Sequence, residues 1–400
     1  MAAGDSQAVS TLSTNLSSDQ DSALYAIHSA LAAGDRVLTL VGPAGSGKTT
    51  LMRALINDVE ASGRSAKLIC PTGKAASVLA SKTGRDACTI HAALYGSHND
   101  DGEELTFGDP GPPCGDGDLL VCDEASMVGS EIHSDIMEWL PPRAQLLYVG
   151  DREQLEPVND TWGPDFDFPT AVLTEVHRQA AGNPIIRLAT AIRNQQPFAG
   201  WDGDRCVRIE SGDPCRWLLE RLIGGVDATL VTFTNLMRQS INSRVRRLLN
   251  HDGDPCRGEP LVVLKNNYDI GRMNGEVLTV ASMHAVKKPT SEHRIAKVVF
   301  ESGEIAMVNL DLMGRPVREF VHWCESLRRR KKQTKDFLHV DFGYCLTVHK
   351  SQGSEWHSVG FVSCPTTRNM RDHEFRRRLG YTAVTRAAEH LTIFRTGRTL

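Results

Sequence analysis

An apolar run followed at once by a glycine-rich loop constrains this chain more than any other feature. Residues 37–41 form the run, and residues 42–49 read Gly-Pro-Ala-Gly-Ser-Gly-Lys-Thr. The three glycines let backbone N–H groups close around phosphate oxygens, and Lys48 can reach the β- and γ-phosphates. Residues 50–56 have a helical composition, so the N-terminal dipole of that helix would face the anion. The sequence therefore predicts a strand, a phosphate-binding loop and a helix that together bind a nucleoside triphosphate.

The loop and its flank supply the residues that we expect to hold the nucleotide. The loop backbone would bind the triphosphate of ATP, and the hydroxyl of Thr49 can ligate the accompanying Mg²⁺. The loop alone does not say what the energy of the nucleotide is used for. The expected phosphate-binding residues are Gly42, Pro43, Ala44, Gly45, Ser46, Gly47, Lys48, Thr49 and Thr50.

Apolar runs alternate with segments of helical composition in the first part of the chain. The runs are continuous, which is typical of strands that are buried on both faces of a sheet. Alternation of strand and helix predicts a parallel sheet with crossover helices. The runs lie at residues 37–41, 66–70, 119–122 and 146–149.

A second α/β unit begins near residue 170. Its apolar run at 228–233 precedes an amphipathic helix that we predict over 235–249. Helical spacing predicts one buried apolar face on this helix, with the arginines directed elsewhere. The expected face consists of Leu236, Ile241, Val245, Leu248 and Leu249, and the arginines off it are Arg238, Arg244 and Arg246.

Two stretches interrupt the α/β pattern. Residues 256–340 contain short β-type runs punctuated by Asn, Gly and Pro, as in a small barrel, before the α/β pattern resumes at 344. Residues 96–118 are rich in Gly, Pro and Asp, with seven acidic residues and no Lys or Arg. Only residues 105–107 of that stretch have the composition of a short strand. We interpret the two stretches as insertions, one in each α/β unit.

Acidic and polar side chains follow the later strands of the first unit. Asp123 and Glu124 come directly after the run at 119–122, at the ligand-binding edge of a parallel sheet. Asp123 can hold Mg²⁺, and Glu124 can orient and activate the attacking water. Gln154 follows the run at 146–149, and its neutral amide can hydrogen-bond both the γ-phosphate and the water.

Hydrolysis also needs positive charge at the developing transition state, which arginine fingers provide. Two candidates, Arg178 and Arg386, stand at junctions of polar and apolar sequence beyond the first unit. If they reach the nucleotide, the site is a cleft between two domains that ATP closes, and such a cleft is the physical basis of a motor. For either arginine alone, a structural salt bridge is an equally good interpretation.

Composition limits the class of protein. The chain has 400 residues, enough for two or three domains, and 40% of them are hydrophobic. No run approaches the ~20 apolar residues of a membrane span, and the N-terminus does not resemble a signal peptide, so we expect a cytoplasmic protein without a membrane partner. The ten cysteines include no Cys-x-x-Cys pair, which argues against a zinc module.

The charge of the chain does not decide whether it binds nucleic acid. The net charge of −4 does not indicate a nucleic-acid-binding protein, but binding requires only a local basic surface. Residues 328–335 form one basic stretch, which fits either a nucleic-acid contact or a solvated loop.

The order of the motifs resembles that of superfamily 1 helicases of the RecD/Dda-like group, the 5′-to-3′ branch. The resemblance covers about residues 16–395 and rests on the phosphate loop and on Asp123-Glu124, 150–158, 347–355 and 381–386. The layout is most similar to compact phage Dda-type helicases, which implies a protein of a bacterial or phage-infected cell. One departure is Glu156, because a proline is usual there, and it puts the rigidity of that loop in doubt.

The resemblance assigns further roles. Gln20 would read the adenine, and Gly353 and Glu355 would join the nucleotide-binding residues. The implied catalytic residues are Lys48, Glu124, Gln154, Arg178 and Arg386. The implied DNA-binding residues are Thr72, Lys74, His91, Phe107, Thr347, His349 and Lys350.

The resemblance also implies a domain plan with two RecA-like domains and two insertions. A tail at 1–14 precedes the first RecA-like domain at 15–168, which carries a pin at 96–118. The second RecA-like domain comprises 169–255 and 341–400, and an SH3-like β-barrel at 256–340 is inserted in it. In this family the pin stacks an aromatic side chain on DNA, and Phe107 is the only aromatic residue of this acidic stretch.

We therefore expect an enzyme that uses ATP and Mg²⁺ to move 5′ to 3′ on single-stranded DNA and to unwind forked duplexes. We expect a monomer, with single-strand-binding or replisome proteins as candidate partners. An alternative is a DNA-stimulated ATPase that translocates or remodels nucleoprotein without separating strands. A hydrolytically silent nucleotide-gated binding module fits less well, because binding alone does not need Glu124, Gln154, Arg178 and Arg386 together. A metabolic or nucleotide kinase would share the phosphate loop but would not need the second α/β unit with its own arginine.

Overall fold

A six-stranded sheet carries the first half of the chain. All of its neighbouring strands are parallel, in the order β3-β2-β4-β5-β1-β6, as predicted from the continuous apolar runs. Its strands are β1 (Val37–Val41), β2 (Ala66–Cys70), β3 (Ala87–Thr89), β4 (Leu119–Cys122), β5 (Gln145–Gly150) and β6 (Ala171–Val172).

The computed structural model describes only part of the 400 residues. Phe107, Arg178, the predicted tail at 1–14, the strand at 105–107 and most of the acidic stretch lie outside the described residues. The described ranges are 16–95, 111–157, 160–176, 182–209, 212–267, 269–272, 274–285, 293–329, 334–364 and 369–395.

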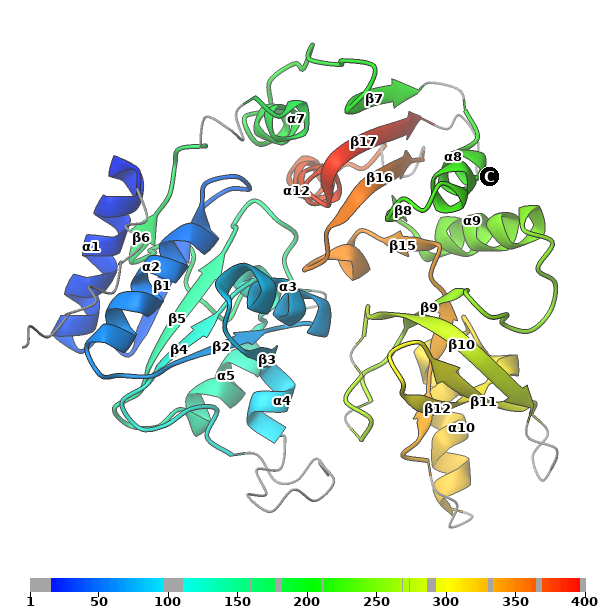
Figure 1. Cartoon of the computed structure of the whole chain (residues 1–400), viewed down its shortest axis with the longest axis horizontal. Coiled ribbons are helices and arrows are strands. Elements are labelled where there is room, and N and C mark those ends of the chain that lie inside the picture. Colours follow the sequence, from blue (N-terminus) through cyan, green and yellow to red (C-terminus); the bar gives the residue numbers. More distant parts are fainter. Residues whose placement is uncertain are drawn as a thin grey trace, which may run out of the picture.

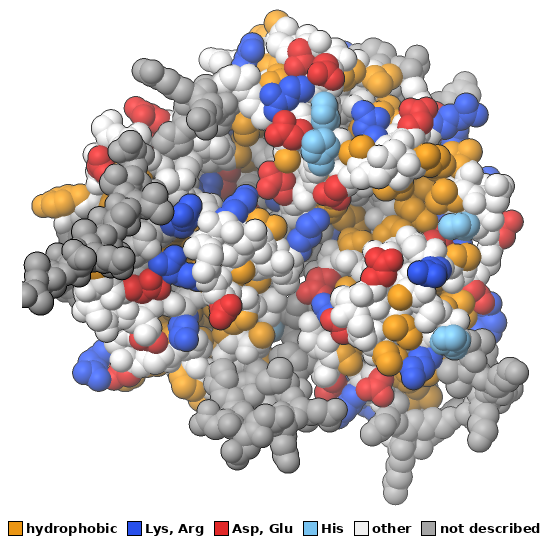
Figure 2. Space-filling model, viewed as in Figure 1, with side chains coloured by type: hydrophobic (Ala, Val, Ile, Leu, Met, Phe, Trp, Pro, Cys, Tyr) orange, Lys and Arg blue, Asp and Glu red, His pale blue; other side chains and the backbone are white. Residues whose placement is uncertain are grey.

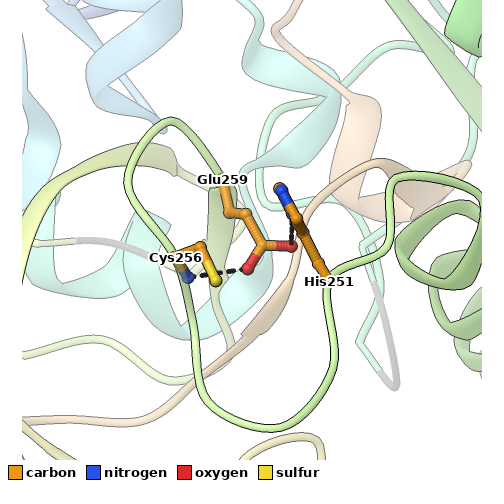
Figure 3. A group of neighbouring side chains, drawn as sticks. All are labelled: His251, Cys256 and Glu259. Carbon is orange, nitrogen blue, oxygen red and sulfur yellow. Dashed lines mark hydrogen bonds and ion pairs between the residues drawn. The ribbon is translucent and has the colours of Figure 1, made fainter.

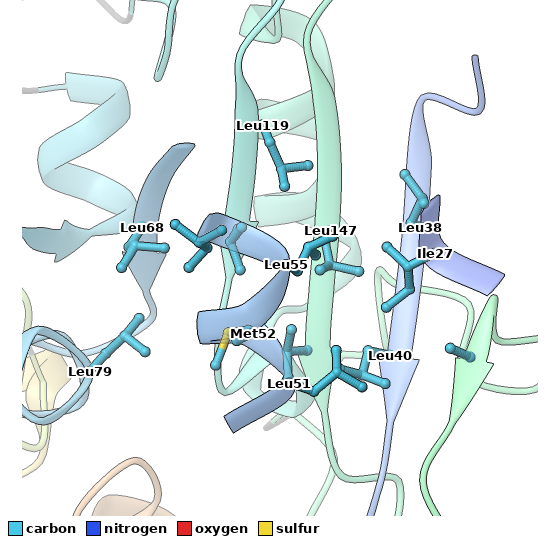
Figure 4. Packing of buried hydrophobic residues seen from close by; sticks show 14 of the residues in the cluster. Ile27, Leu38, Leu40, Leu51, Met52, Leu55, Leu68, Leu79, Leu119 and Leu147 are labelled. Carbon is cyan, nitrogen blue, oxygen red and sulfur yellow. The ribbon is translucent and has the colours of Figure 1, made fainter. Parts of the chain in front are cut away.

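Helices cover the first sheet and bury an apolar core against it. They are α1 (Ser18–Ala33), α2 (Lys48–Ala61), α3 (Gly73–Thr83), α4 (Ile90–Tyr95) and α5 (Ser130–Trp139). Helix α2 follows the phosphate loop directly and lies against the strands (Figure 1). The core around α2 includes Leu40, Leu51, Met52, Leu55, Leu68 and Leu147 (Figure 4).

A second parallel sheet forms in the other half of the chain, in the order β15-β8-β16-β17-β7. The prediction of an α/β fold with two parallel sheets is thereby confirmed. The strands are β7 (Cys206–Ile209), β8 (Ala228–Thr232), β15 (Cys345–Thr347), β16 (Trp356–Ser363) and β17 (Ala387–Arg395). The accompanying helices are α7 (Pro184–Arg193), α8 (Pro214–Ile223), α9 (Asn235–Leu248) and α12 (His373–Val384).

A third sheet lies in sequence between β8 and β15, and it occupies its own part of the molecule beside the second sheet (Figure 1). Its order is β13-β12-β11-β10-β9-β14, and all pairings are antiparallel except that of β12 with β13. The strands are β9 (Pro260–Val263), β10 (Val277–Ala285), β11 (Ile295–Phe300), β12 (Ile305–Asn309), β13 (Phe337–Leu338) and β14 (Val340–Phe342), and helix α10 (Val317–Arg329) accompanies them. The domain boundaries and the SH3-like assignment stay predictions.

Helix α9 corrects one expectation. Ile241 and Val245 are buried as predicted, but Leu236 is 69% exposed. Arg238 and Arg246, expected to lie off the buried face, are both buried. The third sheet explains the difference, because it covers this helix and supplies carboxylates: Arg238 Nη1 lies 2.7 Å from Asp341 Oδ2 of β14. A charge can be buried when it is paired in this way.

The second of these arginines belongs to a group around one fully buried carboxylate. Glu259 accepts hydrogen bonds from Arg246 Nε at 2.8 Å, from the backbone N–H of Cys256 at 2.8 Å and from the Tyr344 hydroxyl at 3.1 Å. His251 Nδ1 lies 3.2 Å from the same carboxylate (Figure 3). The ligand atoms of His251, Cys256 and Glu259 lie within 4.8 Å of one another, but Arg246 already neutralises the carboxylate. We interpret the group as an anchor between α9 and the third sheet.

Glu259→Gln tests this anchor. The substitution leaves the Arg246 guanidinium buried without a counter-charge, so we expect it to lower the free energy of unfolding by about 3 kcal/mol. Glu389→Gln is the matched control, because Glu389 pairs with Arg205 at the surface, where such a pair contributes below about 1 kcal/mol. Urea unfolding followed by circular dichroism measures both. Equal stability of the two variants would contradict the anchor.

Candidate functional site

The parallel register of the first sheet brings three sequence motifs to one edge. Strands β4, β5 and β1 are neighbours, so their carboxyl ends lie side by side. The phosphate loop follows β1, Asp123 follows β4, and Asp151 follows β5. The backbone N–H of Gly42 donates to the carbonyl of Gly150 at 3.2 Å and so ties the loop to the end of β5.

The phosphate loop has the backbone that its glycines predict. Gly45 and Gly47 both have φ of 80°, in the left-handed region that favours glycine. A side chain at Gly42 would meet Ser46 Oγ at 2.6 Å and Leu173 Cβ at 2.9 Å, so the loop is closely packed. Lys48 Nζ donates to the carbonyls of Gly42 at 2.7 Å and Pro43 at 3.0 Å, which holds the amine over the loop.

Two oxygen ligands suited to Mg²⁺ meet beside this loop. The hydroxyl of Thr49 and the carboxylate of Asp123 line one cavity of about 190 Å³, and hard oxygen donors are the set that Mg²⁺ prefers. Burial, followed by the charge of Glu124, raises the pKa of Asp123 to about 6. Glu124 lies next to it with φ of 53°, an uncommon conformation for a residue with a side chain, and lines the same cavity.

Gln154 lies in the same cavity. Its side chain is buried, and its Oε1 has no hydrogen-bond partner among the described residues. A buried polar atom without a partner is costly, and a ligand in the cavity can satisfy it. The position therefore fits the predicted contact of Gln154 with phosphate and water.

The second half of the chain supplies the opposite wall of the cavity. Arg386 is buried there and donates to three neutral oxygens: the carbonyls of Thr382 at 3.1 Å and Ser354 at 3.2 Å, and Thr385 Oγ1 at 3.2 Å. Within the described ranges, no carboxylate forms a salt bridge with Arg386, so its charge is available to an anion. Arg178, the other predicted finger, is outside those ranges.

The cavity combines predicted residues with others that sequence reasoning missed. Gly42, Pro43, Gly45, Ser46, Gly47 and Thr50 belong to the loop and its helix but do not line the cavity. The predicted residues that line it are Ala44, Lys48, Thr49, Asp123, Glu124, Gln154, Gly353, Glu355 and Arg386. The lining residues to which the sequence assigned no role are Ala75, Val78, Leu79, Lys82, Gly150, Asp151, Ser354 and Thr385.

One missed contact closes the cavity across the two halves. Lys82 Nζ on α3 lies 3.4 Å from Glu355 Oε2 of the second half, and both side chains are about half exposed. Nothing in the local sequence of α3 distinguishes Lys82 from an ordinary surface lysine, so this partner required the fold.

Gln20 lies behind the loop rather than in the cavity. Its Oε1 accepts from the backbone N–H of Ser17 at 2.9 Å, and its Nε2 donates to the carbonyl of Gly47 at 3.1 Å. The side chain is buried and ties the start of α1 to the phosphate loop. Its contact with adenine stays a prediction.

Tyr381 joins the two halves at the phosphate loop. Its hydroxyl accepts a hydrogen bond from the N–H of Ala44 at 2.8 Å and donates to Asp151 Oδ2 at 2.6 Å. Burial raises the pKa of Asp151 and of Tyr381. One hydroxyl of helix α12 thus bonds both the phosphate loop and the acid at the end of β5.

A larger cavity of about 550 Å³ lies beside the first and brings together most of the predicted DNA-binding residues. Ser354 lines both cavities, so the two are neighbours. The predicted residues that line the larger cavity are Thr72, Lys74, Thr347, His349 and Lys350. His91 lies on α4 and does not line it, and Phe107 is outside the described residues.

The side chains of this cavity combine cations with hydrogen-bonding groups. Lys74 Nζ lies 4.1 Å from the ring centroid of Trp356, and burial lowers the pKa of Lys74. Burial also lowers the pKa of Lys350 to about 8, and Lys350 Nζ hydrogen-bonds Asn274 Oδ1 of the third sheet. Burial lowers the pKa of His349, which leaves a neutral ring at pH 7.

The third sheet and the second α/β half contribute residues that sequence reasoning did not assign to DNA. Asn274 and Glu276 line the cavity, as do Phe233 and Asn235 from the start of α9. The basic side chains do not form one continuous positive patch. Figure 2 shows Lys and Arg scattered among Asp and Glu on the face of the molecule that it draws.

The described helices include none with both the length and the apolar character that a bilayer crossing requires. This finding agrees with the absence of a long apolar run in the sequence.

Two protein families match the chain. The AAA domain matches residues 15–204, which contain the first parallel sheet, and the UvrD-like helicase C-terminal domain matches residues 342–394 at the end of the second. The two matches thus supply the two walls of the smaller cavity.

Relatives with established names agree with these matches. The chain is 31% identical over 379 residues to the ATP-dependent RecD2 DNA helicase of Deinococcus radiodurans, a match that covers 89% of this chain and 46% of that protein. It is 27% identical over 318 residues to the ATP-dependent DNA helicase dda of Enterobacteria phage T4, covering 74% of this chain and 67% of that protein. The chain therefore spans about half the length of the RecD2 relative.

A solved structure shows the same fold. It describes DNA unwinding at forked duplex DNA by two coordinating Pif1 helicases, and it superposes with a TM-score of 0.51 at 17% identity, covering 95% of this chain and 92% of that one. Together with the family matches, the named relatives and the order of the motifs, this likeness confirms the resemblance. The family matches and the named relatives support the RecD/Dda-like group of superfamily 1 helicases as the group that this chain resembles.

Proposed function

We propose that this protein is an ATP- and Mg²⁺-dependent DNA helicase that moves 5′ to 3′ on single-stranded DNA and unwinds forked duplexes. One observation carries the proposal: Lys48, Glu124 and Arg386, from both halves of the chain, line one cavity, and Ser354 connects it to a second cavity. Events at a nucleotide can therefore reach the second cavity through the segment that contains Ser354. The direction of movement rests on the family resemblance.

The smaller cavity has the parts that phosphoryl transfer requires. Lys48 would bind the β- and γ-phosphates, and Thr49 and Asp123 would hold Mg²⁺, which would supply positive charge to the phosphates. Glu124 would accept the proton of the attacking water, and Gln154 would orient that water. Arg386 would stabilise the charge of the transition state from the opposite half, so hydrolysis requires the cleft to be closed.

The larger cavity fits a single strand better than a duplex. Its lining offers Lys74 and Lys350 for phosphates and the partly exposed ring of Phe233 for base stacking. Its acidic residues, Glu131, Asp160 and Glu276, would repel phosphates and so confine the backbone to the side of the lysines. The cavity involves both α/β halves and the third sheet, so a change in their relative position would move the strand.

A DNA-stimulated ATPase that moves on DNA without separating strands remains the rival function. Such an ATPase would use the same two cavities, and it would differ from a helicase only in leaving the duplex unseparated at the junction. The predicted pin and Phe107, which would act there, are outside the described residues. A nucleotide-gated binding protein without turnover is less compatible with the site, because it needs neither Glu124 nor Arg386 in the cavity.

Strand displacement by the wild type and by Lys48→Ala tests the proposal. We expect the wild type to separate a duplex with a 5′ single-stranded tail in the presence of ATP, and to leave a 3′-tailed duplex intact. Lys48→Ala should reduce DNA-stimulated hydrolysis at least ~100-fold, because it removes a positive charge from the phosphates. It should bind single-stranded DNA as the wild type does.

Three outcomes of this test contradict parts of the proposal. Hydrolysis without displacement on either substrate would favour the rival function. Displacement of the 3′-tailed duplex alone would overturn the direction. Retained turnover by Lys48→Ala would overturn the assignment of the nucleotide cavity.

The pKa of Lys350 predicts a pH dependence of DNA binding. An amine with a pKa of about 8 loses its charge as the pH rises from 7 to 9, and with it one phosphate contact. We expect the affinity of the wild type for single-stranded DNA to fall about threefold to tenfold over this range. Lys350→Arg keeps its charge throughout, so its affinity should change less; identical profiles in fluorescence anisotropy would contradict the contact.

A further inference from the structure

The loop after β5 connects the nucleotide cavity to the second half of the chain. Asp151 and Gln154 of this loop line the cavity, and Leu155 and Glu156 follow them directly. Any displacement of the loop relative to the second half would move Gln154. The contacts that hold it are therefore a determinant of the site.

Leu155 anchors the loop in the second half. Its side chain is buried in the apolar cluster that contains Leu379 and Val384 of α12. Its backbone N–H donates to Thr382 Oγ1 at 3.0 Å, and its carbonyl accepts from Gln352 Nε2 at 3.1 Å. The N–H and the carbonyl of Leu155 are thus both hydrogen-bonded to side chains of the second half.

Two ion pairs flank Leu155. Glu153 pairs with Arg377, and Glu156 Oε1 lies 2.5 Å from Arg378 Nη1, so consecutive arginines of α12 bind the acids on either side of Gln154 and Leu155. The side chains of Arg377 and Glu153 are 12% and 20% exposed, so solvent screens this pair less than a surface pair. Arg378 is 18% exposed, but Glu156 is half exposed, so the second pair is screened more than the first.

Further contacts fix the direction of the arginines. Glu374, one turn earlier on α12, binds Arg377 Nη2 at 2.6 Å and Arg378 Nε at 2.9 Å. Hydrogen bonds first from Arg377 and then from Arg378 lower the pKa of Glu374 to about 2, so it stays charged. The guanidinium of Arg378 also lies 4.8 Å from the ring centroid of Trp162 in the first half.

We propose that Arg377 and Arg378 are positioning residues that hold the Gln154 loop to the second half through Glu153 and Glu156. This proposal deepens the proposed function, because the second half moves with DNA and Gln154 faces the nucleotide. The loop departs from its family at Glu156, where a proline is usual. Here an ionic contact between the halves takes the place of a rigid residue within the loop, and it can open and reform during a cycle.

Charge reversal across one pair tests the proposal in the full-length protein. E156R and R378E each place like charges together across this pair, and the double variant E156R/R378E restores an opposite pair between the halves. The contact of Arg378 with Glu374 is lost in both variants that carry R378E, so the double variant is compared with R378E, which shares that loss. Hydrogen–deuterium exchange of residues 151–157, without nucleotide or DNA, reports how firmly the loop is held. We expect exchange about tenfold faster in each single variant, and return to within about threefold of wild type in the double variant.

Steady-state kinetics supply the functional readout. With saturating single-stranded DNA, each single variant should show a kcat for ATP lower by about tenfold, with KM for ATP changed less than about threefold. The double variant should recover most of kcat. R371E is the matched control, because Arg371 is exposed just before α12 and undergoes the same change of charge; it should match the wild type in both measurements.

Two results would overturn the proposal. One is wild-type exchange in both single variants, because the pair would then not hold the loop. The other is a double variant as impaired as the singles while its thermal unfolding is unchanged, because the effect would then not depend on the pair. A wild-type protein that displaces no strand would refute the proposed function but would leave the exchange result intact.

Discussion

The side-by-side carboxyl ends of β4, β5 and β1 are the constraint on which the rest of the structure depends. In a parallel sheet these ends meet at one edge, so residues far apart in sequence, such as Lys48, Asp123 and Gln154, meet without any dedicated scaffold. The helix after the phosphate loop adds its dipole at the same place. We propose that a site built in this way binds a triphosphate and that Arg386 of the second half completes its positive charge.

The second half is therefore part of the site, and its attachment to the first is polar as well as apolar. The Tyr381 hydroxyl joins Ala44 to Asp151, and Leu155 is buried among residues of α12. Polar contacts between halves are suited to a cleft that opens and closes, because water can replace them at small cost. The contacts of α9 with the third sheet differ, since their carboxylates are buried against arginines, so we expect the third sheet to stay attached to the second half when the cleft opens.

The sequence predicted the elements better than the contacts between them. Strand β1 and the phosphate loop were predictable because continuous apolar runs and glycines report local requirements of the backbone. The burial of Arg238 was not, since an arginine on an amphipathic helix is normally solvated and only the third sheet supplies Asp341. Lys82 and Arg378 were missed for the same reason: their partners, Glu355 and Glu156, lie more than two hundred residues away in sequence. Phe107 and Arg178 stay predictions.

The central claim is that the two halves form one hydrolytic site, and Arg386 tests it most directly. The measurement is ATP turnover by Arg386→Ala at saturating single-stranded DNA, with nucleotide affinity and thermal unfolding measured on the same preparation. We predict a loss of turnover of about 10³-fold or more with nucleotide affinity nearly unchanged, because the arginine acts on charge that develops in the transition state. Turnover within a few fold of the wild type in a folded variant would contradict the account.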